Sequence, residues 1–85
     1  MNDKYREIVD FMSNNVPYKR IDLVDNLDST LSQVGYDSLG FIEMIVLAEE
    51  QFGIQISQND FPEKERVRDY AQMIYDKVEQ KDGRN

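Results

Sequence analysis

The chain has 85 residues, which is long enough for one small domain and too short for two. Its 17 acidic and 10 basic side chains leave a formal net charge of −7, whereas a nucleic-acid surface needs clustered Lys and Arg. Cys and His are both absent, which excludes thiol nucleophiles, His-based triads and Cys/His metal sites. A core of this size without a disulfide favours helices, because local contacts suit small domains.

The first predicted helix begins near Asn2 or Asp3, since either residue could cap it. Its apolar residues follow the helical spacing of one buried stripe. Pro17 ends the helix, because proline has no amide hydrogen and blocks the preceding turn. The predicted buried stripe consists of Tyr5, Ile8, Val9, Met12 and Val16.

A long connection follows, over residues 17–36. Loops of this length without structure are uncommon inside small domains. This one carries apolar residues at regular intervals, namely Ile21, Leu23, Val24, Leu27, Leu31 and Val34. We therefore expect it to be anchored to the core rather than disordered.

The second predicted helix spans residues 38–52, and Gly53 suits a left-handed stop. One apolar stripe has the spacing of a core face and comprises Phe41, Met44, Ile45, Ala48 and Phe52. A second stripe, on the other side, comprises Leu39, Ile42 and Val46, with Glu43 and Glu50 within it and Glu49 at its border. This stripe is either a surface for a partner or a face covered by loop residues. Periodicity alone does not separate the two.

The remaining elements complete an all-α fold. Ile54 and Ile56 anchor a short connection, in which Asn59 or Asp60 could cap a single turn around Phe61 and Pro62. The last predicted helix spans residues 65–78, with a buried stripe of Val67, Tyr70, Ala71, Ile74 and Val78. The pattern predicts a small antiparallel bundle of three main helices plus one short helix. Residues 1–79 form the single domain, and residues 80–85 are expected to be a polar, disordered tail.

The sequence Gly35-Tyr36-Asp37-Ser38-Leu39 opens the second helix. Alone, Asp37 or Ser38 would be an ordinary helix cap. At the end of the same helix stands Glu-Glu-x-Phe-Gly-Ile-x-Ile, over residues 49–56. In this combination the chain resembles the acyl carrier protein family, the phosphopantetheine-dependent acyl and peptidyl carriers. The resemblance covers nearly the whole chain, is specific over residues 31–56, and accounts for the long first loop.

The resemblance implies that Ser38 carries a covalent 4'-phosphopantetheine arm derived from coenzyme A. Asp37 and Leu39 match the neighbours of the modified serine, and Asp37 would assist attachment by helping to hold Mg²⁺. The start of a helix also offers unpaired amides and a partial positive charge, which favour a phosphodiester. The positions that match the family's partner-binding residues are Leu39, Ile42, Glu43, Val46, Glu49 and Glu50.

Two residues depart from the family pattern. Gly40 stands where many carriers have an acidic residue, so we expect less charge near the arm and a more flexible helix start. Arg66 precedes Val67 where the family often places Ser or Thr as a cap. We expect the last helix to begin more loosely, or to be capped by other groups.

The resemblance implies a free-standing, non-catalytic acyl carrier for fatty-acid or polyketide-type biosynthesis. A phosphopantetheinyl transferase would load it, and acyl- or aminoacyl-activating ligases, acyltransferases or ketosynthases would use the thioester. The alternatives are an aminoacyl or peptidyl carrier, for nonribosomal peptides or D-alanyl transfer, and a non-carrier helical adaptor. A hydrolase that used Ser38 would lack a histidine base.

We expect no metal-binding residues and a monomer. The chain shows no membrane-spanning stretch and no export signal, so a cytoplasmic location is the expectation.

Overall fold

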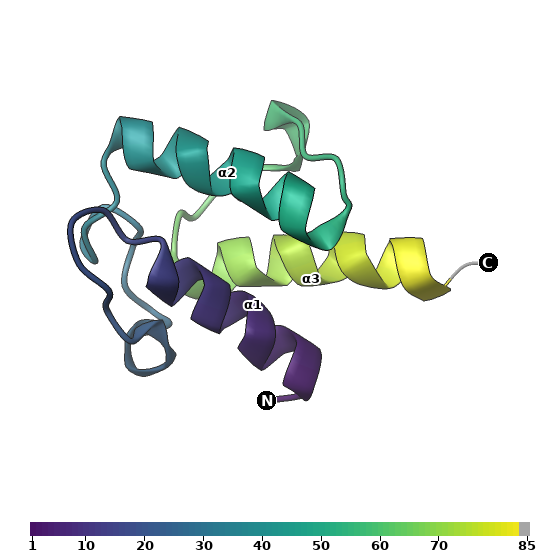
Figure 1. Ribbon diagram of the computed structural model, residues 1–85, viewed down its shortest axis with the longest axis horizontal. Coiled ribbons are helices and arrows are strands. Elements are labelled where there is room, and N and C mark those ends of the chain that lie inside the picture. The colour runs from purple at the N-terminus through teal and green to yellow at the C-terminus, as the bar shows by residue number, and fades with distance from the viewer. Residues whose placement is uncertain (84–85) are drawn as a thin grey trace.

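The computed structural model describes residues 1–83 and is all-helical. Its elements are α1 (Asp3–Asn14), the 3-10 helix η1 (Leu23–Asn26), α2 (Ser38–Phe52), the 3-10 helix η2 (Gln58–Asp60) and α3 (Val67–Gly83). Figure 1 shows α1 running against the direction of α2 and α3, which run the same way. The predicted bundle of three main helices with a long first loop is therefore confirmed, and its antiparallel pairing is that of α1 with the other two.

The core lies where the three α-helices meet. Asn2 caps α1, because its Oδ1 accepts a hydrogen bond of 2.7 Å from the amide of Tyr5. The predicted stripe of α1 is buried except for Tyr5, which is half-buried, and Ile8, Val9 and Met12 are fully enclosed. Phe11, outside that stripe, is buried too, because α2 covers a second side of α1 through an edge-to-face contact between Phe11 and Phe52.

The long connection between α1 and α2 is anchored to the core, as predicted. Leu23, Leu31 and Val34 are buried. Sequence patterns did not identify Ser13 of α1, which is fully buried and serves as a tether. Its hydroxyl donates to the carbonyl of Val9 and accepts from the amide of Leu23, both at 2.9 Å. The serine thereby satisfies a loop amide that would otherwise be buried without a partner.

Backbone carbonyls of this connection cap the start of α3. The amide of Val67 donates to the carbonyl of Ser29 at 2.8 Å, and the amide of Arg68 donates to that of Leu27 at 2.9 Å. The first amides of a helix have no acceptor within it, so the loop supplies what a Ser or Thr cap would supply. For the start of α3, which follows Arg66, we expected either a looser beginning or capping by other groups, and the second expectation is correct.

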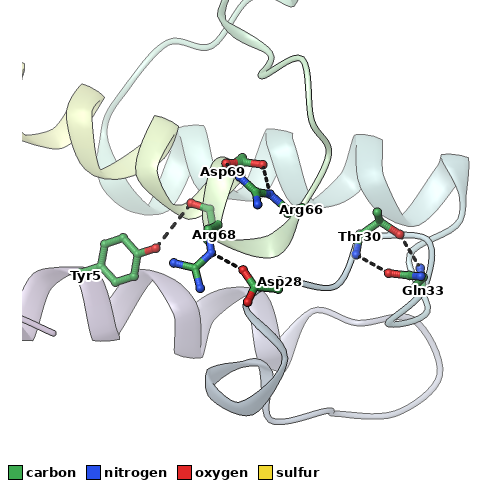
Figure 2. A network of polar contacts seen from close by, with 7 residues as sticks. All are labelled: Tyr5, Asp28, Thr30, Gln33, Arg66, Arg68 and Asp69. Atoms are coloured by element: carbon green, nitrogen blue, oxygen red, sulfur yellow. Dashed lines mark hydrogen bonds and ion pairs between the residues drawn. The ribbon is translucent and has the colours of Figure 1, made fainter.

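Side chains strengthen the same junction (Figure 2). The Arg66 guanidinium donates to both carboxylate oxygens of Asp69, at 2.8 and 3.1 Å. Arg68 donates to Asp28 at 2.6 Å, and so joins α3 to the loop. These hydrogen bonds lower the pKa of both carboxyl groups below their usual range. The start of α3 is thus closed by main-chain and side-chain contacts together.

The C-terminal third differs from prediction in its boundaries. The short turn lies at Gln58–Asp60, before Phe61 rather than around it. Ser57 begins the turn and Asp60 closes it, since the amide of Ser57 donates to the Asp60 carboxylate at 2.9 Å. α3 continues through Gly83, into the predicted tail, whose last two residues lie outside the described residues. Within residues 1–83, no helix has the length and apolarity needed to cross a membrane.

Candidate functional site

The start of α2 presents the Ser38 hydroxyl to solvent. Asp37 is the N-cap, in an extended conformation, and its Oδ1 accepts a hydrogen bond of 2.7 Å from the amide of Gly40. The carbonyl of Asp37 accepts from Phe41 at 2.8 Å. Capping therefore falls to Asp37, and Ser38, the first residue of the helix, is exposed with its side chain outside the cap.

Gly35 and Tyr36, which lead into α2, are held by contacts with the C-terminal end of α1 and the residues that follow it. Gly35 has a φ of 113°, a conformation that L side chains rarely adopt, and an added Cβ would lie 3.1 Å from Val16. Tyr36 is buried, and its hydroxyl donates to the carbonyl of Met12 at 2.6 Å. Burial raises the pKa of Tyr36 well above its usual value. These contacts fix the entry into α2 on the end of α1.

Gly40 is required by close packing, which corrects the expectation of a flexible helix start. It is buried, and a Cβ at this position would lie 2.4 Å from Cγ of Pro17. Glycine is the residue that allows such an approach. An acidic side chain would meet Pro17 here, so the departure from the family pattern follows from the contact between the first loop and α2.

The second stripe of α2 is open to solvent. Leu39, Ile42 and Val46 are 66%, 57% and 46% exposed, so the interpretation in which loop residues cover them is wrong. Leu47, which the stripe did not include, is 41% exposed and widens the face. We call these four apolar residues, with Glu43 and Glu50 among them, the α2 face.

Glu49, at the border of the α2 face, makes an internal contact. It is half-buried, and its Oε2 accepts a hydrogen bond of 2.8 Å from the amide of Ile56. Gly53, between them, adopts the predicted left-handed conformation, with a φ of 65°. The Glu49 carboxylate therefore holds the turn after α2, a role that helical spacing alone does not show.

An apolar groove begins beside Ser38, on the flank of the α2 face. It has a volume of about 430 Å³, and its lining includes Ile42, Ile45 and Val46 from α2 and Phe61 from the later connection. We call it the Ser38 groove. The sequence did not indicate it, because Phe61 comes from a segment that only the fold brings to α2.

Aromatic rings form one wall of the Ser38 groove. Phe41 meets Phe61 and Tyr70 edge to face, with both pairs of ring centroids 5.3 Å apart. Such arrangements are favourable beyond the area that they bury. Burial raises the pKa of Tyr70 to about 12. The packed rings fill the space beneath the groove, so the groove is a feature of the protein surface.

The site has the features that a serine-linked phosphodiester needs. The amides of Ser38 and Leu39 are the first two of α2, and the partial positive charge of the helix lies at this end. An anion attached to the Ser38 hydroxyl would lie in that field. The exposed hydroxyl and the adjoining groove leave room for a long substituent, so these residues fit a phosphopantetheine group.

Comparison with known proteins agrees with this geometry. The sequence model of the family described as "phosphopantetheine attachment site" matches residues 19–74, which is more than half of the chain. No curated protein and no solved structure matches the chain. The matched segment runs from the first loop to α3 and contains the whole of α2. The chain therefore belongs to the phosphopantetheine-attachment family of carrier proteins, whose domains bind 4'-phosphopantetheine covalently.

Proposed function

We propose that this protein is an acyl carrier protein and that Ser38 is its attachment residue. One observation carries the proposal: within the family match, the Ser38 hydroxyl stands exposed at an open helix start beside Asp37. In the loading step, Ser38 Oγ forms a bond to the phosphorus that bears pantetheine in coenzyme A. The bond from that phosphorus to the adenosine bisphosphate breaks, and the serine proton passes to a base of the transferase.

The Ser38 groove supports acyl cargo of the fatty-acid or polyketide type. Apolar groups provide most of its surface, and Ser38 lies at its edge. An aliphatic chain that folds back along the arm would remove apolar area from water there. Aminoacyl cargo is the second candidate, because the rings of Phe41, Phe61 and Tyr70 pack against one another and occupy space that a long acyl chain would need.

The protein itself is proposed to be non-catalytic. Its part is to present the thioester to enzymes that dock on the α2 face, where exposed Leu39 and Ile42 stand beside exposed Glu43 and Glu50. With a net charge of −7, the chain favours partners that present basic patches, and such contacts weaken with salt.

Mass spectrometry of the intact protein tests the attachment. The protein is incubated with coenzyme A, Mg²⁺ and a broad-specificity phosphopantetheinyl transferase. We expect the wild type to gain one arm and Ser38→Ala to gain none. Ser32→Ala, at another exposed serine of the same loop region, is the matched control and should be loaded like the wild type. A folded wild type that gains no mass, or a loaded Ser38→Ala, would contradict the proposal.

The melting temperature of loaded forms tests the cargo. The transferase can load hexanoyl- or alanyl-pantetheine from the corresponding coenzyme A thioester. A chain that binds the Ser38 groove stabilises the folded state, so the hexanoyl form should melt higher than the alanyl form. Ile42→Asn, in the groove lining, should remove the difference. Equal melting temperatures in the wild-type forms would favour aminoacyl cargo.

A further inference from the structure

Tyr18, in the first loop, combines full exposure with an unfavourable backbone conformation. Its side chain is 98% exposed and its φ is 75°. Large L residues rarely adopt a positive φ, because Cβ crowds the following carbonyl. An exposed ring gains nothing from burial that would offset this cost. Strain of this kind persists where the surroundings impose it, and it gathers at functional sites.

The surroundings of Tyr18 do impose its position. On one side of it Val16 is buried and Pro17 packs against Gly40. On the other side, Arg20 donates to the side chain of Asn14 at 2.6 Å. The amide of Ile21 donates to the carbonyl of Ser13 at 3.3 Å. Tyr18 is thus the tip of a short turn with both stems tied to the helices.

This turn packs against the start of α2, the helix that presents the attachment residue. Pro17 touches Gly40, which follows Ser38 by two positions on α2. At about 100° per residue, Ser38 and Gly40 lie on nearly opposite flanks of the helix, with Leu39 and Glu43 between them. The Ser38 groove therefore borders the α2 face on one flank, and the turn that carries Tyr18 borders it on the other.

We propose that Tyr18 is a docking residue for the phosphopantetheinyl transferase, an inference that rests on the proposed function. The transferase must cover the Ser38 hydroxyl, and an interface of standard size occupies about 800 Å² on each partner. A surface of that size over Ser38 and Glu43 extends to the turn next to Gly40. The partner would present basic side chains to Glu43 and Glu50 and an apolar recess to the Tyr18 ring. Tyrosine is among the residues that contribute most at interfaces.

The test compares three substitutions at one position. Tyr18→Ala removes the ring, Tyr18→Phe keeps it, and Tyr18→Gly removes it while relieving the backbone. We measure kcat and KM of the transferase with each variant as substrate, and the Kd of each unloaded variant for the transferase by calorimetry. Loss of an interface anchor should raise KM and Kd about tenfold for the Ala and Gly variants, with kcat nearly unchanged. The Phe variant should stay within about twofold of the wild type.

Melting temperatures separate docking from folding. Glycine adopts a positive φ without strain, so Tyr18→Gly should melt as high as the wild type or up to about 5 °C higher. A variant that is at least as stable as the wild type, yet binds the transferase more weakly, has lost a contact rather than its fold. Glu79→Ala, exposed on α3, is the control and should change none of these values.

Two results would overturn the inference. The first is wild-type KM and Kd in both Tyr18→Ala and Tyr18→Gly. The second is a defect in Tyr18→Ala that Tyr18→Gly repairs, which would assign the effect to the backbone. A folded wild type that the transferase does not load would instead refute the proposed function, so the two failures are distinguishable.

Discussion

The starts of α2 and α3 are chemically alike and structurally opposite. Each has the unpaired amides and the partial positive charge of a helix N-terminus. At α2, the Asp37 side chain is the cap, and Ser38 and Leu39 remain exposed. At α3, the carbonyls of Leu27 and Ser29 occupy the first amides. Accessibility, rather than the helix dipole, therefore decides which of the two helix starts can hold an attached group.

The long connection between α1 and α2 accounts for both the exposed start of α2 and the covered start of α3. Its two ends support α2 from behind, through the contact of Pro17 with Gly40 and the hydrogen bond from Tyr36 to Met12. Its middle crosses the start of α3, where Asp28 reaches Arg68 (Figure 2). The long loop is therefore a structural part of the site, because it closes one helix start and positions the other.

The largest expected effect on stability comes from Gly40→Ala, which would push the first loop away from the exposed start of α2. The added Cβ would lie 2.4 Å from Pro17. Overpacking costs about 1–3 kcal/mol, and we expect the upper part of this range because the rigid Pro17 ring has to move, against a gain of at most about 1 kcal/mol from the better helix former. We expect a melting temperature lower by about 4 °C or more in a thermal scan. Pro17→Ala should restore much of the loss, and a Gly40→Ala variant as stable as the wild type would contradict the close contact.

Asp37 tests whether the cap of the open start also takes part in loading. Asp37→Ala removes the cap and should cost about 0.5–2 kcal/mol in urea unfolding. Asp37→Asn keeps a capping oxygen, so its stability should be close to that of the wild type. Both variants should load about tenfold more slowly or worse, if the carboxylate helps to hold Mg²⁺. A wild-type loading rate for Asp37→Asn would leave Asp37 as a cap alone.

Tyr36→Phe tests the support beneath the open start. Loss of the 2.6 Å hydrogen bond to Met12 should cost about 0.5–1.5 kcal/mol at neutral pH. Burial raises the pKa of Tyr36 in the folded state, so its contribution is complete below the unfolded value of about 10. The contribution is then lost as the pH rises toward the folded value. Unfolding free energies measured from pH 9 to 11 should therefore fall less steeply for Tyr36→Phe than for the wild type.

The smallest effects are expected at the closed start of α3. The hydrogen bond from Arg66 lowers the pKa of Asp69, so its stabilising contribution is present above the usual value near 4. That contribution is lost as the pH falls through the lowered value. Asp69→Asn should lower the melting temperature at pH 7 by about 2–4 °C and weaken its dependence on acid.

Asp28→Asn is the matched control at the same junction. Its side chain is 78% exposed in the ion pair with Arg68, and exposed pairs contribute little. We expect a change within about 2 °C. If Asp28→Asn lowered the melting temperature more than Asp69→Asn, the ion pair between Arg68 and the loop would contribute more to stability than the Arg66–Asp69 contact.

The elements that local patterns specify are predicted closely. α2 occupies residues 38–52 as expected, since Asp37 caps one end and Gly53 takes the left-handed stop at the other. The core stripe of α2 is buried, with Phe41 partly so. The assignment of Phe61 to a short turn is wrong, because its ring is held against Phe41 and Tyr70 after the turn has ended.

The sequence by itself determined the family pattern around Ser38, the helix with two apolar stripes, and the anchored loop. These follow from caps and periodicity, which act among residues three or four positions apart. Only the tertiary structure decided that the second stripe of α2 is exposed, that the start of α3 is closed, that Gly40 admits Pro17, that a groove adjoins Ser38, and that Tyr18 is held exposed. Each of those depends on segments that lie far apart along the chain and meet only when the core forms.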